Sequence, residues 1–359
     1  MKIALLGDIA FFGKYSLDNN PLLYEYFKDV KQLLNSVDLV VGNLETPFVT
    51  NQKKYGAKSA YICSTVKNVD LLKYLNISIV NLANNHLYDY GKEAFNLTKE
   101  ILKTNSIDYF GVEDKQVSLE TNGNKIAFNG FCCYSTNPIG MGINGVNELN
   151  IPIIRDIMKR NTHNGYYNIL SIHTGEEHIN YPNLNNIKMA RMLSNEFSYV
   201  YYGHHPHVVQ GVENVNDSLL LYSLGNFCFD DVYTSKSNIP LIKQSENNKT
   251  GLIVILEFND SNLNKSEFYP IYLGEEKMVV NHFNNFYQIK DYSQKLSLSE
   301  NNYYEMRKQL LTSYVNTRKK TRDLIWYLKR MNINTIKMIL NSRKNSKKYY
   351  DTLVKYIYK

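Results

Sequence analysis

Residues that could bind a metal ion or transfer a proton recur directly after short apolar runs of this 359-residue chain. The runs are KIALLG, DLVVG, ISIVNLA, NILSI and YVYYG, and each is typical of a buried β-strand. Because the loops beyond the carboxyl ends of parallel strands meet on one side of a sheet, we expect the side chains that follow to form one site. They are Asp8, then Asn43 and Glu45, then Asn84, Asn85 and His86, then His173, and last His204, His205 and His207.

The residue types narrow the chemistry of that site. Imidazole, carboxylate and amide groups without a thiolate suit Mn, Fe, Zn or Mg better than they suit a cysteine-rich structural zinc site. His205 and His207 flank Pro206, so they point in different directions and could bind two different ions. Two ions ~3.5 to 4 Å apart polarise a phosphoryl oxygen and generate a hydroxide nucleophile, which favours phosphoester hydrolysis. Taken alone, the histidine cluster could equally be a polar turn that closes a strand.

Alternating segment types predict the elements that position these residues. Strand patterns alternate with amphipathic helical patterns, which is the rhythm of an α/β protein. Asn122 and Gly123, between two strand patterns, predict a hairpin. After the histidine cluster we expect antiparallel strands at 218–227, 250–258 and 266–273. The other predicted strands are 2–8, 38–45, 77–86, 107–112 and 166–173, and the predicted helices are 21–37, 69–76, 91–105, 151–160 and 184–195.

Six motifs extend the pattern: GDI, GNLETP, NLANNHLYDYG, HTGEE, GHHPHVVQG and YSLGNFCFD. In this order they resemble the CapA family of capsule or poly-γ-glutamate synthesis proteins, which is similar to the calcineurin-like metallophosphatases. The resemblance implies an α/β fold with a metallophosphatase-like two-sheet β-sandwich flanked by helices. We expect this domain at residues 1–285, followed by a basic helical C-terminal region at residues 297–359.

The resemblance also implies a role for each ligand candidate. Asp8 and His207 would hold one ion, and Glu45, or Asn43 two positions earlier, would bridge both ions. The second ion would be held by Asn85, His173 and His205, together with Glu45. His86 resembles the catalytic histidine that contacts phosphate or protonates a leaving oxygen.

Five further motif residues could bind a metal or orient a ligand. They are Asn84, Asp89, Glu177, His204 and Asn226. Asp89 could instead begin the following helix, and Glu177 could lie at a turn. His204 could be a spare histidine, or a true ligand if the register is shifted by one residue.

Two functions follow from the resemblance. The first is a metal-dependent phosphatase or phosphodiesterase in the synthesis of capsule, poly-γ-glutamate or another cell-envelope polymer, with a metal-bound hydroxide as nucleophile and His86 as acid. Its substrate would be a phosphorylated small molecule or a polymer precursor. The second is a non-catalytic metal- or polymer-binding component of the same machinery. Ala10 favours the second function, because most metallophosphatases have a histidine at that place.

The distribution of charge separates the C-terminal region from the rest. Residues 301–359 have 15 Lys and Arg against 3 Asp and Glu, whereas residues 1–300 have 26 against 31. Such a basic region suits an anionic partner, and a membrane surface fits better than nucleic acid because the region lacks organised stacking residues. The N-terminus lacks the features of a signal peptide, and no run approaches the ~18 apolar residues of a membrane span. We therefore expect a cytoplasmic protein, peripheral at the inner face of the membrane if the basic region binds lipid.

Overall fold

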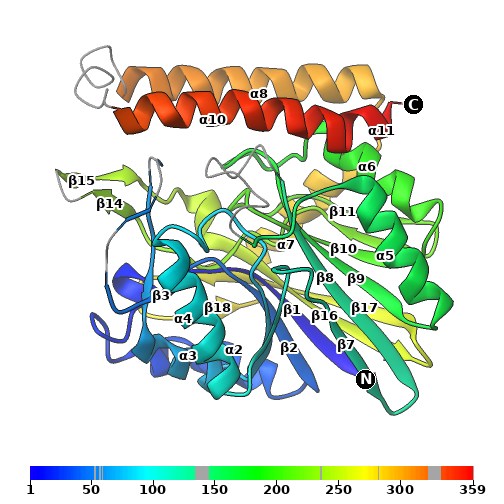
Figure 1. The fold of residues 1–359 in the computed structure, drawn as a ribbon, viewed down its shortest axis with the longest axis horizontal. Coiled ribbons are helices and arrows are strands. Elements are labelled where there is room, and N and C mark those ends of the chain that lie inside the picture. Colours follow the sequence, from blue (N-terminus) through cyan, green and yellow to red (C-terminus); the bar gives the residue numbers. More distant parts are fainter. Residues whose placement is uncertain are drawn as a thin grey trace.

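Two mixed β-sheets packed face to face form the centre of the molecule (Figure 1). The computed structural model describes residues 1–51, 54–55, 58, 60–133, 145–234, 237–281, 283–321 and 333–358. Helices cover the outer face of each sheet, as the sequence predicts for a two-sheet sandwich flanked by helices.

The first sheet carries Asp8 and Asn43 on neighbouring strands. Strands β1, β2, β5 and β6 are parallel, so their carboxyl ends lie at the same edge. The spatial order is β18 (Met278–Val280), β17 (Asn262–Leu273), β16 (Thr250–Asn259), β1 (Lys2–Ile9), β2 (Leu39–Leu44), β5 (Ile77–Asn81) and β6 (Asp108–Phe110), and β13 (Asn226–Cys228) pairs with the end of β1.

The second sheet carries His173 and His204 at the ends of adjacent strands. Its four central strands are parallel, and the two edge strands, β7 and β11, are antiparallel to their neighbours. The spatial order is β11 (Val212–Val215), β12 (Ser218–Leu221), β10 (Tyr199–His204), β9 (Tyr167–His173), β8 (Asn124–Cys132) and β7 (Val117–Thr121).

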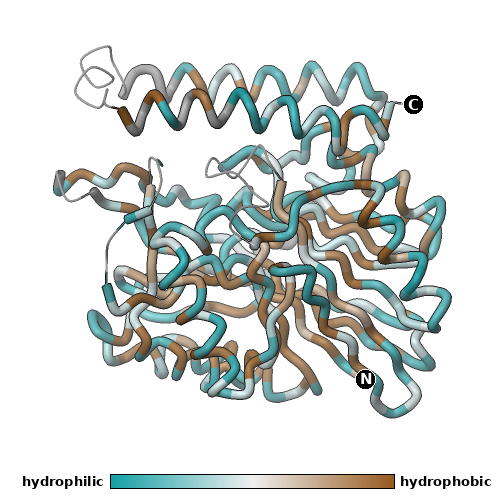
Figure 2. The backbone as a smooth tube through the Cα atoms, viewed as in Figure 1, coloured by the Kyte–Doolittle hydropathy of each residue, from teal (hydrophilic) through white to brown (hydrophobic). Residues whose placement is uncertain are grey.

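Alternating strand residues build the layers. In β1, Ile3 and Leu5 lie between the sheets, whereas Ala4 and Leu6 face the helices outside the first sheet. This follows from the two-residue period of a strand, which sends successive side chains to opposite faces. Figure 2 shows apolar residues gathered along the strands of both sheets.

Helices α1 to α4 lie on the first sheet, and α5 and α6 lie on the second. Their bounds are α1 (Leu23–Tyr26), α2 (Lys28–Leu34), α3 (Val69–Tyr74), α4 (Gly91–Thr104), α5 (Ile151–His163) and α6 (Leu184–Ser194). Short elements complete the domain: η1 (Gly13–Tyr15), β3 (Phe48–Val49), β4 (Ser64–Thr65), η2 (Val66–Asn68), β14 (Val232–Thr234), β15 (Ser237–Ile242) and η3 (Glu246–Lys249).

The C-terminal region is helical, as predicted, and it packs on the domain. Tyr303 and Leu353 are buried in the same apolar cluster as the outer face of the second sheet. In Figure 1 helices α8 and α10 run across the top of the view, away from the N-terminus. The elements are α7 (Phe283–Lys295), α8 (Glu300–Thr321), α10 (Ile333–Tyr349), η4 (Tyr350–Val354) and α11 (Lys355–Ile357). Among the described helices, none is both long and apolar enough to cross a membrane.

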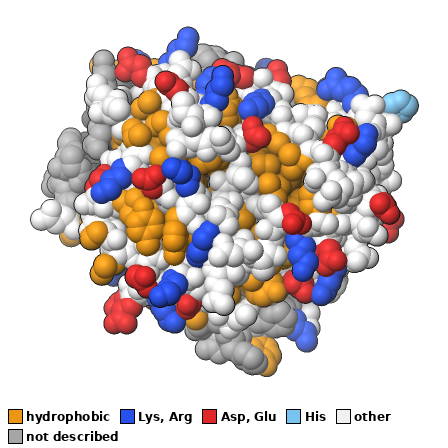
Figure 3. All heavy atoms as spheres, turned by 90° about the horizontal axis from the view of Figure 1, so that it is seen from below, with side chains coloured by type: hydrophobic (Ala, Val, Ile, Leu, Met, Phe, Trp, Pro, Cys, Tyr) orange, Lys and Arg blue, Asp and Glu red, His pale blue; other side chains and the backbone are white. Residues whose placement is uncertain are grey.

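Figure 3 shows the molecule from below, on the side away from α8 and α10. Charges of both signs are interspersed with apolar patches on this face. That face carries no large region of one sign in this view. The basic excess of the chain lies in residues 301–359, as the residue counts give it.

Two expectations from the sequence are wrong in detail. The helix expected at 21–37 is divided in two at Phe27, which leaves helical geometry and stacks on Phe227 with ring centroids 5.9 Å apart. The strand expected at 218–227 is also two strands, and both have parallel neighbours. Gly225, at a φ of 66°, lets the chain cross from one sheet to the other. The predicted hairpin at Asn122 and Gly123 is confirmed.

Candidate metal centre

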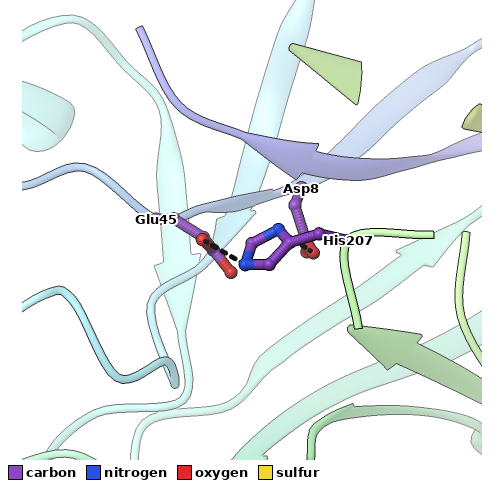
Figure 4. Close-up of side chains that lie close together, drawn as sticks. All are labelled: Asp8, Glu45 and His207. Carbon is purple, nitrogen blue, oxygen red and sulfur yellow. Dashed lines mark ion pairs between the residues drawn. The ribbon is translucent and has the colours of Figure 1, made fainter. Parts of the chain in front are cut away.

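Three of the predicted ligands converge at the edge where the two sheets end (Figure 4). Asp8, Glu45 and His207 are buried, and one ligand atom from each lies within 4.8 Å of the others. The His207 ring lies between the carboxylates, with Nδ1 3.4 Å from Asp8 Oδ2 and Nε2 3.8 Å from Glu45 Oε2. Parallel pairing of β1 with β2 brings Asp8 beside Asn43, and Glu45 follows two residues later.

Asn43 points its amide nitrogen into the centre. Nδ2 donates to Asp8 Oδ1 at 2.9 Å and to Glu45 Oε1 at 3.4 Å. Asn81 fixes this orientation, because its Oδ1 accepts from the Ala83 backbone and its Nδ2 therefore donates to Asn43 Oδ1. A Cβ at Gly130 would lie 2.1 Å from Asn81 Oδ1, so only glycine leaves room for this bond. Asn43 thus orients the two carboxylates and turns its amide oxygen to Asn81, whereas Glu45 lies between the two predicted ligand groups.

The predicted ligands of the second ion form an adjoining group. Asn85 Oδ1 lies 2.8 Å from His173 Nε2, and the Nδ1 of the same imidazole lies 3.5 Å from Glu45 Oε1. The rings of His173 and His205 have centroids 4.8 Å apart. Glu45 therefore lies between this group and the group formed by Asp8 and His207.

His204 and Asn226 orient ligands. His204 Nδ1 lies 2.9 Å from Asp8 Oδ1, while the His205 backbone N–H donates to Oδ2. The Nδ2 of Asn226 donates to the Asn248 carbonyl, so its Oδ1 accepts the Nδ1 proton of His207 at 2.9 Å. The His207 Nε2 lone pair consequently faces Glu45.

His86 is held beside this group by two charged residues. Its Nδ1 lies 2.7 Å from Asp89 Oδ2, and Lys58 Nζ donates to Asp89 Oδ1 at 2.5 Å and to the Asn85 carbonyl at 2.6 Å. Burial and the Lys58 charge lower the pKa of His86, against the opposing effect of Asp89. For Asp89 burial raises the pKa, but Lys58 and His86 outweigh it and lower the value. Asp89 therefore remains an anion that holds His86 in place.

Sequence reasoning missed Lys58 and Asn81. Lys58 lies in KKYGAKSAYIC, where nothing in the spacing distinguishes it from the neighbouring lysines. Asn81 ends the strand β5 and could have been found, because a polar residue that closes an apolar strand is the signal that identified Asp8 and His173.

Asn84 and Glu177 lie at the margins of the centre. The side chain of Asn84 forms hydrogen bonds with backbone groups. Its Oδ1 accepts from the backbone N–H groups of His86 and Leu87, and its Nδ2 donates to the Leu44 carbonyl. Glu177 is one-third exposed. Partial burial raises its pKa, but the imidazoles of His205 and His207 outweigh this and lower it to about 2.

The electrostatics of the centre favour a cation. Burial and the neighbouring Asp8 charge raise the pKa of Glu45 well above its ordinary value. Burial also raises the pKa of Asp8, but His204 and His207 outweigh it and lower the value. Burial lowers the pKa of His205 to about 4, so this imidazole is neutral with a lone pair available. Two close carboxylates among neutral imidazoles gain from a positive charge between them.

Three buried polar atoms support the same conclusion. Within the described residues, Glu45 Oε2, His204 Nε2 and His205 Nδ1 have no hydrogen-bond partner. Buried polar atoms normally have one, and Glu45 Oε2, which lies 3.8 Å from His207 Nε2 in the centre, is therefore placed to bind a metal ion. Together with the mixture of oxygen and nitrogen donors, they fit one or two divalent cations.

Fewer predicted ligands are available for the first expected ion than for the second. Ala10 is fully buried in an apolar cluster with Ile62 and Phe229, where a metallophosphatase histidine is expected. Asp8, His207 and the shared Glu45 remain for this ion, against Glu45, Asn85, His173 and His205 for the other. Among the described residues, the three ligand atoms that lie within 4.8 Å of one another nevertheless belong to the first position.

The histidine loop has unusual backbone geometry. His205 has a φ of 95° and His207 a φ of 57°, in the region that residues other than glycine rarely adopt. Such conformations cost ~1–3 kcal/mol each and occur most often at functional sites. At these backbone positions the His207 ring lies between Asp8 and Glu45, and the His205 ring lies beside that of His173.

Two capsule or PGA biosynthesis proteins of Bacillus are similar to this chain in sequence. The chain is 32% identical over 260 residues to the PGA biosynthesis protein CapA of Bacillus subtilis (strain 168), covering 68% of this chain and 67% of that protein. It is 27% identical over 279 residues to the capsule biosynthesis protein CapA of Bacillus anthracis, covering 72% and 67%. Among solved structures, 5'-nucleotidase from Candida albicans SC5314 is 12% identical with a TM-score of 0.42, covering 89% of this chain and 57% of that one.

A family model provides the assignment. The model described as bacterial capsule synthesis protein PGA_cap matches residues 2–231. This range includes every predicted ligand, from Asp8 to Asn226, and more than half of the chain. The protein therefore belongs to the PGA_cap family of bacterial capsule synthesis proteins.

Proposed function

We propose that this protein is a metal-dependent phosphoester hydrolase in the synthesis of capsule, poly-γ-glutamate or another cell-envelope polymer. The observation that carries the proposal is the buried Asp8, Glu45 and His207 centre, adjacent to a histidine whose Nδ1 is held by Asp89. Bound divalent ions would polarise a phosphoryl oxygen and activate the attacking water. Membership of the PGA_cap family supports the proposed role in polymer synthesis.

In this proposal, different residues bind the metal ions and transfer the proton. Asp8, His207 and Glu45 would hold one ion, and Glu45, Asn85, His173 and His205 would hold the other. His86 donates Nδ1–H to Asp89, which leaves Nε2 for the substrate. To act as the acid, His86 must carry a second proton on Nε2, and because burial and Lys58 lower its pKa, the imidazolium so formed gives that proton readily to a leaving oxygen and returns to the neutral ring.

The test is hydrolysis of a generic phosphomonoester and phosphodiester with added Mn²⁺, alongside metal content after purification. His86→Ala should lower kcat about 100-fold, the loss expected for an acid-base group, while metal content stays unchanged. His163→Ala is the matched control, because His163 is exposed at the end of α5, outside the metal centre. Turnover that His86→Ala leaves unaltered would show that the activity comes from elsewhere.

A second candidate function is a non-catalytic metal- or polymer-binding component. The buried Ala10 favours it, because the first ion lacks a histidine ligand at that position. This function predicts that the wild-type protein retains metal but hydrolyses neither test substrate. That result would replace the first proposal with the second.

The C-terminal helices add a proposed partner, an anionic membrane surface. On α10 the exposed residues Ile333, Ile336 and Leu340 share one face with four exposed basic residues, at spacings of three and four. Those basic residues are Lys337, Arg343, Lys344 and Lys347. Apolar side chains beside a basic stripe suit the interface of an anionic bilayer.

Vesicle sedimentation tests this contact. The full-length protein should sediment with phosphatidylglycerol-containing vesicles and not with pure phosphatidylcholine, and added salt should release it. Ile336→Asn with Leu340→Asn should weaken sedimentation, whereas the same change at the exposed Ile153 of α5 should not. Equal sedimentation of both variants would exclude α10 as the contact.

A further inference from the structure

Helix α8 holds the loop that follows His173. The guanidinium of Arg307 is buried against this loop, where Nη2 pairs with Glu176 Oε2 and Nε donates to the Tyr181 carbonyl at 3.0 Å. One turn earlier, the buried Tyr303 hydroxyl donates to the Pro182 carbonyl at 2.8 Å. A third contact follows two turns after Arg307, where the Tyr314 ring lies 5.9 Å from that of His178.

The opposite side of the same loop supports the histidine motif. The backbone N–H of Thr174 donates to the His204 carbonyl at 3.1 Å, and that of His178 donates to the Pro206 carbonyl at 2.8 Å. Farther along, Gln210 Nε2 donates to the Ile179 carbonyl at 2.8 Å. The loop at 174–183 is therefore bonded to α8 on one side and to the segment at 204–210 on the other.

We propose that Arg307 and Tyr303 are positioning residues, which hold the loop at 174–183 so that it keeps His205 and His207 in metal-binding geometry. The proposal rests on the proposed metal-dependent function. It also assigns a role at the site to a helix outside the residues that the family model matches, 2–231.

The strained histidine loop explains why such support is needed. His205 and His207 both have positive φ, which the backbone keeps only where the surroundings impose it. Residues that orient metal ligands through other groups typically change metal affinity about 10- to 100-fold when they are lost. Simple packing of α8 would instead contribute stability without changing the metal centre.

The experiment compares Arg307→Met with Arg155→Met in the full-length protein. Arg155 is the control, because its guanidinium also pairs with a glutamate, Glu196, outside the loop and the metal centre, although its side chain is 47% exposed and that of Arg307 10%. Calorimetric titration with Mn²⁺ should show about 10-fold weaker binding for Arg307→Met and no change for Arg155→Met. Amide hydrogen exchange should become faster at 174–183 and 204–210 in the first variant alone.

A charge exchange separates positioning from general damage to the fold. Glu176→Arg combined with Arg307→Glu restores the ion pair but not the bond to Tyr181, so Mn²⁺ affinity should recover in part. Unchanged Mn²⁺ affinity and unchanged exchange in Arg307→Met would overturn the proposal, as would equal changes in Arg155→Met. These measurements need no turnover, so a wild-type protein that binds Mn²⁺ without hydrolysing phosphoesters would refute only the catalytic function.

Discussion

Glu45 is the residue whose state depends most on a bound cation. It lies between both predicted ligand groups, and one of its oxygens has no hydrogen-bond partner within the described residues. Its raised pKa means that the metal-free protein keeps a proton on Glu45 to a higher pH than an ordinary glutamate does. A bound cation requires the carboxylate form, so metal binding and proton release are coupled.

The affinity for Mn²⁺ should therefore increase as the pH rises. Between about pH 4 and the raised pKa of Glu45, Mn²⁺ binding should release a proton, and affinity should rise with pH until Glu45 is ionised without metal. His205, with a pKa of about 4, is already neutral there and contributes little. Calorimetry in two buffers of different ionisation enthalpy measures the release, and equal heats would contradict it. Glu177→Gln is the control, because a pKa of about 2 leaves Glu177 ionised throughout.

Lys58 should matter for stability as well as for His86. Its side chain is 5% exposed and its partner Asp89 is fully buried, so Lys58→Met leaves a buried anion that keeps His86 and the Ile62 backbone N–H but no full positive charge beside it. We expect a loss of about 3 kcal/mol in the free energy of unfolding. Urea unfolding measures this loss, and Lys99→Met, whose partner Glu113 is about half exposed, should cost less than about 1 kcal/mol. Adding Asp89→Asn to Lys58→Met should restore part of the stability.

At the scale of elements, the loop after β10 has a backbone conformation that lowers stability at the residues of the predicted metal site. His205 has a φ of 95°, so alanine at this position keeps the backbone strain and glycine relieves it. In metal-free protein, His205→Gly should be more stable than His205→Ala by about 1 kcal/mol, the reverse of the usual order. At His204, which does not have positive φ, alanine should be the more stable replacement. The unfolding temperatures of the four variants measure this difference. If alanine is more stable than glycine at both positions, the backbone at His205 is not strained.

At the scale of the whole molecule, the C-terminal helices share a core with the domain. The predicted boundaries at 1–285 and 297–359 separate two segments that meet in one apolar cluster, where Tyr303 and Leu353 are buried. Deleting residues 300–359 should cost about 3 to 6 kcal/mol, since burying each of these side chains contributes about 1.5 to 3 kcal/mol. The truncated protein should unfold at lower urea concentration and bind a hydrophobic dye. An unchanged midpoint would mean that the helices form an independent unit.

Much of the fold was predictable because the spacing of apolar residues along the chain distinguishes strands from helices. Buried strands and amphipathic helices have distinct spacings, and these gave most elements of the two sheets. The errors fall where distant contacts override a local pattern. Phe27 interrupts a helical pattern because it stacks on Phe227, which lies 200 positions later in the sequence. Gly225 divides an apolar run between two sheets, which no single-strand pattern reveals.

The order of residues specifies which chemical groups follow which strands, and parallel strands bring such groups to one edge of a sheet. Only the tertiary structure decided how they are oriented. Asn43 and His204 orient Asp8, Lys58 lies on Asp89 across 31 positions of sequence, and Arg307 reaches Glu176 across 131. Periodicity describes each element along its own axis, whereas these contacts depend on how separate elements pack. The composition of the metal centre is therefore a property of the sequence, and its geometry is a property of the fold.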